Sequence, residues 1–465
     1  MRSTMKTVLK LWLGWCLLAS VFAGGARADT LKAGVAKVDI TPAPGLPLWG
    51  FENRKTPATG TRDPLYARVL VLEAGETRLA LVALDLGRCF GPASLQHLRE
   101  LAGKRSGISY LLAVASHTHS APVISDSYPQ GPQCVPAWET STLEKIAAAI
   151  DEARQHAVEA RLGTGYGVAY IGHNRLAHNP DGTVSWFERN TTRIPTAPID
   201  PTVSVLRVDT ADGKPLAILV NYACHPVVFG SDNLEYSADF PGVMTKTVED
   251  TFAGQPLCIF LQGAPGDINP FYAVTPVEQG AEKWRDWSGQ RLGEEAARVA
   301  KQIHTEAAPS ACLDYAENQL TFSLRWDLDK FRQALMQALG PQGFLVYATS
   351  LAPQFQLPVG TVLINRRIAF MTMPGEPFVD LQVNWRDRCP VRDAFFLGYA
   401  NGYYGYFPTI RASTEGGYGA ASSSTWIEVG AGERMVDHAV IQTYRMLGRY
   451  RDLPEDMQPK TAMNR

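Results

Sequence analysis

The chain contains 465 residues, of which 45% are hydrophobic and 19% are charged, as in a globular protein with a sizeable core. This composition argues against a disordered chain and against a coiled coil. The formal net charge of −2 leaves no excess of basic residues to bind a phosphate backbone. We therefore expect no nucleic acid among the partners.

Residues 1–28 have the pattern of a secretory signal peptide. Arg2, Lys6 and Lys10 form a basic start, an apolar run covers residues 11–22, and a small-x-small cleavage pattern ends the segment. The apolar run is shorter than the roughly 20 residues that a transmembrane helix needs, so we expect no stable transmembrane anchor. The sequence predicts an exported protein that is periplasmic or secreted.

The cysteines that follow the leader could form disulfide bonds, because export would expose them to an oxidising compartment. They are Cys89, Cys134, Cys224, Cys258, Cys312 and Cys389. No Cys-x-x-Cys pair occurs, and the spacing does not choose among the possible pairings. We expect most of them to be small buried residues, with one or two disulfide bonds.

Helical periodicity alternates with strand-like runs along the whole mature chain. Helices are predicted over residues 92–104, 141–160, 279–306, 327–339 and 433–447. Apolar, β-branched runs of strand length lie between them, and no linker interrupts the alternation. We therefore predict one large α/β domain over residues 29–453, in which mixed β-sheets are flanked by helices. Residues 454–465 are expected to form a flexible tail.

Strand-like runs end in turns that contain Gly or Pro together with polar side chains. These runs cover residues 109–115, 216–222, 257–261, 368–373 and 395–399. In open α/β sheets, ligands bind outside the carboxyl ends of the strands. We expect these turns to converge on one active site.

Histidine and carboxylate side chains occur in several of those turns. His117 and His119 are two residues apart, so an extended segment would direct both rings to the same side. His225 and Glu376 follow two later strands. Two or three histidines with one carboxylate form a typical zinc ligand set that leaves room for water. From the residues alone, His117 and His119 could both be ligands, or one could bind the metal while the other acts on the substrate.

Together these motifs resemble the catalytic domain of the neutral (non-lysosomal) ceramidase family. The paired histidines lie in residues 116–120, Gly-Asp-x-x-Pro in 266–270, Pro-Gly-Glu-Pro in 374–377 and Asn-x-Tyr-x-x-Tyr in 401–406. The resemblance begins at residues 34–42 and covers nearly the whole mature chain.

The resemblance also implies the roles of individual residues. It implies one Zn²⁺ per chain, held by His117, His225, Glu376 and Tyr406. By the same resemblance, His119 contacts the substrate and assists proton transfer, and Arg175 polarises the substrate. The alternative for the paired histidines is that His119 binds zinc and His117 is structural.

Two positions differ from the family ceramidases. Asn269 replaces a Ser, and an amide cannot act as the nucleophile. We expect Asn269 to donate a hydrogen bond to the substrate or to the zinc-bound water; the alternative is a turn-forming Asn before Pro270. A second family Tyr, expected before Glu-Gly-Gly, is replaced by Thr414.

These features predict a zinc-dependent hydrolase that cleaves an amide (N-acyl) bond with zinc-bound hydroxide. The expected substrate is a small-molecule or lipid-like acyl compound. One alternative is an ester, lactone or sugar N-acyl hydrolase that uses the same site. The other is a non-catalytic binding protein with a degenerate site. No oligomeric state is predicted.

Overall fold

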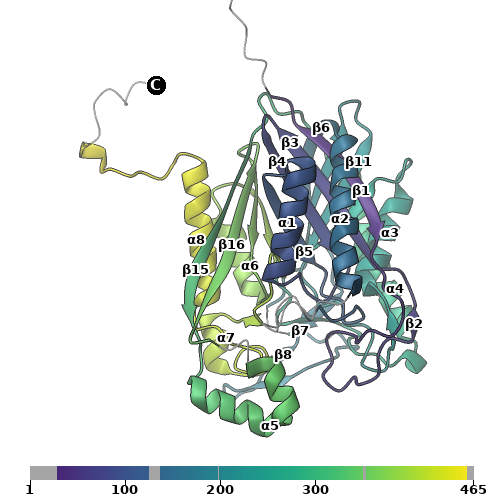
Figure 1. Cartoon of the computed structure of the whole chain (residues 1–465), viewed down its shortest axis with the longest axis vertical. Helices are drawn as coiled ribbons and strands as arrows, with labels where there is room; N and C mark the ends of the chain where they lie inside the picture. Colours follow the sequence, from purple (N-terminus) through teal and green to yellow (C-terminus); the bar gives the residue numbers. More distant parts are fainter. Residues whose placement is uncertain (1–28, 125–136, 197, 349–351, 458–465) are drawn as a thin grey trace, which may run out of the picture.

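The computed structural model describes residues 29–124, 137–196, 198–348 and 352–457. The expected leader at 1–28 lies outside these residues, as does most of the expected tail, of which only the part up to residue 457 is described. Two β-sheets pack face to face, and helices cover their outer faces (Figure 1). The predicted α/β domain with mixed sheets and flanking helices is confirmed.

The larger sheet has eight strands in the order β13-β11-β10-β6-β1-β3-β4-β5. Its strands are β1 (Lys32–Asp39), β3 (Tyr66–Ala74), β4 (Thr77–Leu84), β5 (Tyr110–Ala115), β6 (Val158–Val168), β10 (Thr202–Thr210), β11 (Pro215–Tyr222) and β13 (Leu257–Gln262). The β4–β5 and β11–β13 pairs are parallel, and the other pairs are antiparallel. Both parallel pairs lie at the edges of the sheet.

The smaller sheet has four strands, of which β17 and β19 pair in parallel. Its strands are β15 (Leu313–Ser323), β16 (Gln354–Ile364), β17 (Ile368–Thr372) and β19 (Asp393–Leu397). Short pairs join the loops: β2 (Gly60–Thr61) with β12 (Glu235–Tyr236), β7 (Gly172–Asn174) with β14 (Ile268–Pro270), β8 (Leu176–His178) with β9 (Val184–Trp186), and β18 (Glu376–Pro377) with β20 (Tyr406–Phe407).

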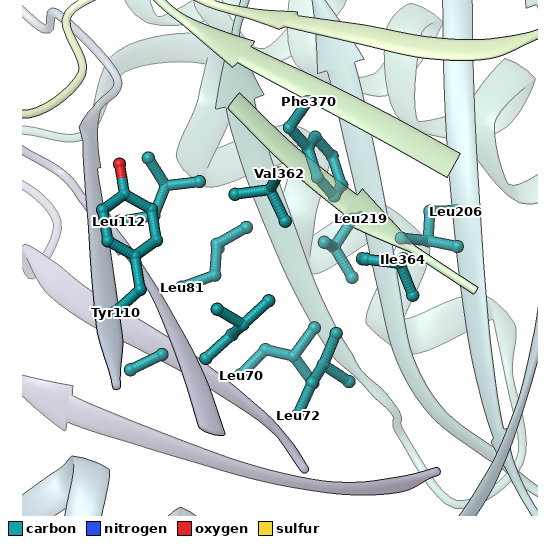
Figure 2. A pocket seen from close by; sticks show the side chains of 12 residues that line it. Leu70, Leu72, Leu81, Tyr110, Leu112, Leu206, Leu219, Val362, Ile364 and Phe370 are labelled. Carbon is teal, nitrogen blue, oxygen red and sulfur yellow. The ribbon is translucent and has the colours of Figure 1, made fainter. Parts of the chain in front are cut away.

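Apolar side chains fill the space between the two sheets. Leu70 and Leu72 of β3 point inward toward Val362 and Phe370 of the smaller sheet (Figure 2). Val69 and Val71 of the same strand belong to the core on the opposite face, under the helices. Alternate residues of a strand point to opposite faces, so this sheet is buried on both sides.

Helices form the two outer layers. Over the larger sheet lie α1 (Pro92–Ser106), α2 (Ala137–Gln155), α3 (Asp239–Thr251) and α4 (Ala281–Gln302); over the smaller sheet lie α6 (Val379–Arg388) and α8 (Ala431–Met446). The remaining helices are α5 (Leu328–Ala348), α7 (Ile410–Glu415), η3 (Val277–Gln279) and η4 (Glu455–Met457). Within the described ranges, no helix is long and apolar enough to cross a membrane.

The buried residue Gln262 holds together the carboxyl ends of strands from both sheets. The Gln262 side chain donates to the carbonyls of Ser116 and Cys224, at 2.8 and 2.9 Å, and the backbone carbonyl of Gln262 accepts from the N–H of Gly398. These residues follow β5, β11 and β19. The predicted convergence of the strand ends is therefore observed, and it joins the two sheets at one point.

The cysteines of the described chain do not form the expected disulfide bonds. Cys89, Cys224, Cys258, Cys312 and Cys389 are free thiols, and Cys134 lies outside the described residues. Cys89, Cys224 and Cys258 are fully buried within apolar clusters. There they pack as small hydrophobic side chains, as the sequence predicted for most of the cysteines.

Candidate active site

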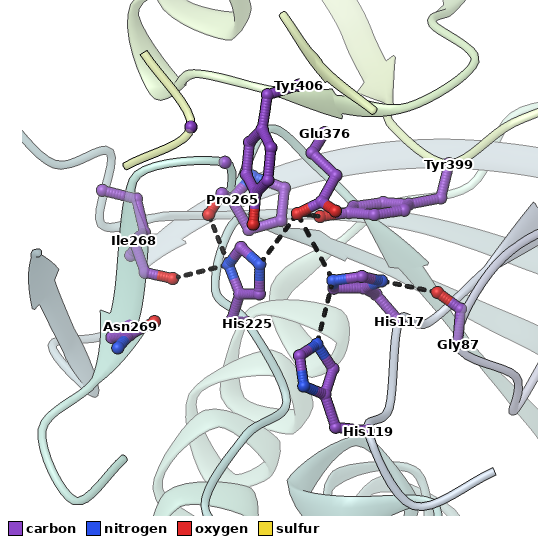
Figure 3. A network of polar contacts seen from close by, with 12 residues as sticks. Gly87, His117, His119, His225, Pro265, Ile268, Asn269, Glu376, Tyr399 and Tyr406 are labelled. Carbon is purple, nitrogen blue, oxygen red and sulfur yellow. Dashed lines mark hydrogen bonds and ion pairs between the residues drawn. The ribbon is translucent and has the colours of Figure 1, made fainter. Parts of the chain in front are cut away.

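Two histidines are held by backbone carbonyls behind them. His117 Nδ1 lies 2.5 Å from the carbonyl oxygen of Gly87, and His225 Nδ1 lies 2.6 Å from that of Pro265 (Figure 3). A carbonyl oxygen only accepts, so both Nδ1 atoms carry the proton and both Nε2 atoms present a lone pair. His117 also has a left-handed backbone, with φ 71°, which is uncommon for a residue other than Gly and clusters at functional sites.

The two Nε2 atoms face the carboxylate of Glu376. Its Oε2 lies 3.1 Å from His225 Nε2 and 3.4 Å from His117 Nε2. His119 approaches from the other side, with its Nε2 at 3.2 Å from His117 Nε2. The ligating atoms of the three histidines lie within 4.8 Å of one another. This convergence of lone pairs and a carboxylate on one point fits a bound metal cation.

Burial and mutual charge set the protonation of these groups. Burial, reinforced by the positive charge of Arg175, lowers the pKa of His225 to about 3. Burial and then the neighbouring His117 and His225 lower the pKa of His119 well below its ordinary value. Burial alone would raise the pKa of Glu376, but His117 and His225 outweigh it and hold that pKa well below the usual range. A neutral His225 imidazole and an ionised Glu376 carboxylate are the forms in which these groups bind a metal.

Tyrosine hydroxyls surround the same carboxylate. Tyr399 donates to Glu376 Oε2 at 3.1 Å, and Tyr403 donates to Glu376 Oε1 at 2.5 Å. Tyr406, the expected fourth ligand, lies opposite Glu376 in the parallel β18–β20 pair. Burial raises the pKa of Tyr406 well above its ordinary value, although Arg175 opposes this shift. Neither tyrosine was expected in the site: Tyr399 lies outside the motifs, and Tyr403 is the first tyrosine of Asn-x-Tyr-x-x-Tyr, in which only the closing Tyr406 was given a role.

Arg175 and Asn269 form one hydrogen-bonded unit beside the histidines. Arg175 follows β7, and Asn269 lies in β14, which pairs with β7. Arg175 Nη1 donates to Asn269 Oδ1 at 3.1 Å, and Arg175 Nη2 donates to the hydroxyl of Tyr406 at 2.9 Å and to the carbonyl of Gly266 at 2.6 Å. Asn269 Nδ2 donates to the carbonyl of Glu188. The amide of Asn269 thus orients Arg175, and Arg175 orients Tyr406.

The loop that contains Thr414 brings a different residue, Tyr418, to the site. The Thr414 side chain is exposed and donates to the carbonyl of Arg411. Tyr418, four residues later, packs edge-on against Tyr406 with ring centroids 5.5 Å apart, and the Arg175 guanidinium lies 5.5 Å from the Tyr418 ring. Tyr418 therefore brings an aromatic hydroxyl residue of the same loop beside Tyr406, although it does not occupy the position of Thr414.

The site opens into a cavity of about 220 Å³ with aromatic walls. His117, His119 and Glu376 line it together with Trp49, Phe51, Tyr403, Tyr406, Tyr418 and Trp426. Concave, largely apolar surfaces with a few convergent polar groups are typical of small-molecule sites. The cavity can therefore admit an organic substrate to His117, His119 and Glu376.

Comparison with known proteins agrees with this arrangement. The crystal structure of neutral ceramidase from Pseudomonas aeruginosa aligns with a TM-score of 0.72 at 20% identity, over 93% of this chain and 76% of that chain. A structure of a ceramidase complexed with C2 aligns with a TM-score of 0.72 at 19% identity, over 94% of this chain and 78% of that chain. These likenesses show a shared fold. Residues 31–281, more than half of the chain, match the family described as neutral/alkaline non-lysosomal ceramidase, N-terminal, and the protein belongs to that family.

Proposed function

We propose that this protein is an exported, zinc-dependent hydrolase that cleaves the amide (N-acyl) bond of a small-molecule or lipid-like acyl substrate. The observation that carries the proposal is the convergence of His117 and His225 on Glu376, whose Oε2 lies 3.4 and 3.1 Å from their Nε2 atoms while backbone carbonyls fix the far side of each imidazole. Such outer hydrogen bonds orient metal-binding histidines and raise their basicity. Membership of the ceramidase family supports amide hydrolysis as the reaction.

Four side chains would hold the zinc in this proposal: His117, His225, Glu376 and Tyr406. When bound, zinc supplies a Lewis acid and lowers the pKa of water at its open position to about 7. Tyr399 and Tyr403 donate to Glu376 and orient its carboxylate.

His119 would transfer the proton between the attacking water and the leaving amine. Its ring lies in the cavity and is neutral at ordinary pH, because its pKa is lowered. A neutral imidazole can accept a proton from the attacking water and then donate it to the leaving amine. Since an amide nitrogen leaves poorly as an anion, this second transfer is essential for breaking the bond.

Arg175 would stabilise negative charge as it develops on the acyl oxygen. Its guanidinium is fully buried and fixed by Gly266, Asn269 and Tyr406, so it needs little reorganisation during the reaction. Its positive charge lies against Tyr406 and Tyr418, two residues that line the cavity.

The test combines metal content with activity. Purified mature protein is examined by elemental analysis and then assayed on an N-acyl amide and on the ester of the same acyl group, with and without a chelator. We expect about one zinc per chain and amide hydrolysis that chelation abolishes and added zinc restores. Absence of stoichiometric transition metal would refute the site, and chelator-sensitive cleavage of the ester alone would favour the alternative esterase function. Export is tested separately by fractionation and N-terminal sequencing, with Asp29 expected first.

A further inference from the structure

A loop near the amino terminus is attached to the segment that carries His119. The N–H of Trp49 donates to the carbonyl of Ala121, and the N–H of Val123 donates to the carbonyl of Pro47, both at 2.9 Å. Ala121 and Val123 follow His119 closely in the chain. Nothing in the sequence motifs assigns a role to this loop, which lies far from the paired histidines in sequence.

Gly50 of this loop lies against the His119 ring. Its φ is 105°, and a Cβ atom at this position would lie 2.3 Å from His119 Cγ and 2.4 Å from His119 Nδ1. Both the backbone conformation and the space therefore require glycine. Without a side chain, the Gly50 backbone can border one side of the imidazole directly.

Phe51 and Arg54 contact His119 from the same loop. The Phe51 ring packs edge-on against the imidazole, with centroids 4.9 Å apart. Arg54 Nη1 donates to the carbonyl of His119 at 2.8 Å, and its guanidinium lies 5.0 Å from the Phe51 ring. Ring and backbone of His119 are thus held by one short segment.

We propose that Gly50, Phe51 and Arg54 are positioning residues that hold the His119 ring with its Nε2 toward the metal centre. This inference rests on the proposed function, in which His119 transfers the proton. Proton transfer requires the base within hydrogen-bond reach of its partner, and a misplacement of about 1 Å can cost 10²-fold in rate. None of the three residues is a proposed zinc ligand, so their replacement changes turnover without removing the metal.

The first test compares Gly50→Ala with Gly45→Ala. Gly45 has a similar φ of 112°, but a Cβ there meets nothing within 4 Å, so the control shares the backbone strain without touching His119. We expect Gly50→Ala to lower kcat by about 10², with zinc content and KM close to wild type, and Gly45→Ala to retain near-wild-type kcat. Equal kcat for the two variants would overturn the proposal. So would loss of zinc from Gly50→Ala, because it would make His119 a ligand.

The second test uses milder substitutions, in case Gly50→Ala fails to fold. Arg54→Met removes the hydrogen bond to His119, Arg54→Lys can still donate one, and Lys55→Met is the control at the exposed neighbouring position. We expect kcat to fall in Arg54→Met, to recover in part in Arg54→Lys, and to remain unchanged in Lys55→Met. A kcat for Arg54→Met equal to that of Lys55→Met would contradict the inference.

A readout without catalysis separates this inference from the proposed function. In metal-free protein with ¹⁵N-labelled histidine, the His119 ring resonances should shift in Gly50→Ala and Arg54→Met but not in their controls. If wild type shows no chelator-sensitive hydrolysis but these shifts occur, the proposed function fails while the loop still positions the ring. Unshifted resonances in an active enzyme would refute the positioning role alone.

Discussion

Glu376 and Tyr406 lie directly opposite each other in the parallel β18–β20 pair, so a two-residue ladder brings a carboxylate and a phenol to the same point of the site. The N–H of Glu376 is bonded to the carbonyl of Gly405, and the N–H of Phe378 to that of Phe407. Backbone pairing therefore fixes the relative position of two proposed zinc ligands before any metal binds.

Replacement of His225 by Ala should remove the metal. His225 supplies one proposed ligand, and its loss leaves Glu376 without its closest imidazole partner at 3.1 Å. We expect elemental analysis to find about one zinc in wild type and little in His225→Ala. His178→Ala is the matched control, because His178 is exposed and pairs with Glu415; it should keep its zinc. Full zinc content in His225→Ala would remove this residue from the ligand set.

Alanine variants of the two paired histidines should differ in metal content. His119→Ala should retain zinc while kcat falls by roughly 10²–10⁴, as expected for the loss of an acid–base group. His117→Ala should lose the metal, since its Nε2 faces Glu376 while Gly87 binds its Nδ1. The reverse result, a metal-free His119→Ala with a metal-replete His117→Ala, would exchange the two roles. Metal and activity in both variants would rule out the proposed zinc-hydrolase site here.

Asn269→Ala should lower turnover through Arg175. The substitution removes the acceptor at 3.1 Å from Arg175 Nη1 and leaves a buried donor without its partner. We expect kcat to fall by about 10², with zinc content unchanged. Asn179→Ala, which alters an amide bound to Thr183 and Ser185 in the β8–β9 turn, is the control and should remain active. Mass spectrometry during turnover should find no acyl adduct at Asn269; such an adduct would contradict the positioning role.

Burial of Asp239 should make stability depend on pH. Burial raises its pKa to about 6, despite hydrogen bonds from the N–H groups of Phe229 and Phe240. A carboxyl group with a raised folded-state pKa stabilises the fold fully below its unfolded pKa of about 3.9, and this contribution is lost as pH rises through the folded pKa. Wild type should therefore lose stability relative to Asp239→Asn between about pH 4 and pH 6, by on the order of 3 kcal/mol.

Urea unfolding of both metal-free proteins across this range measures the difference. A constant difference between wild type and Asp239→Asn from pH 4 to pH 7 would show that Asp239 titrates at an ordinary pKa. The comparison cancels the titration of groups that the two proteins share.

The sequence allowed prediction of the strand ends and of most long helices, because each has a strong local pattern. Helix α3 was missed, since Pro241 and Gly242 in it are usually helix breakers. Pro241 lies in the first turn, where its missing N–H costs no hydrogen bond. Tyr418 was missed for another reason: only the folding of its loop back onto Tyr406 places it in the site. The Gly50–Phe51 contacts with His119 are likewise tertiary, and no periodicity encodes them.

The three hydrogen bonds of Gln262 connect the core between the sheets to the proposed metal site. Because Gln262 ties the turn before His117 to the turn before His225 and, through Gly398, to the smaller sheet, the ligands keep their spacing only while the two sheets keep their alignment. The affinity of the proposed site for metal therefore depends on the alignment of the two sheets. Substitutions deep between the sheets, at Leu70 or Phe370, are therefore expected to weaken metal binding at the proposed site without touching any proposed ligand.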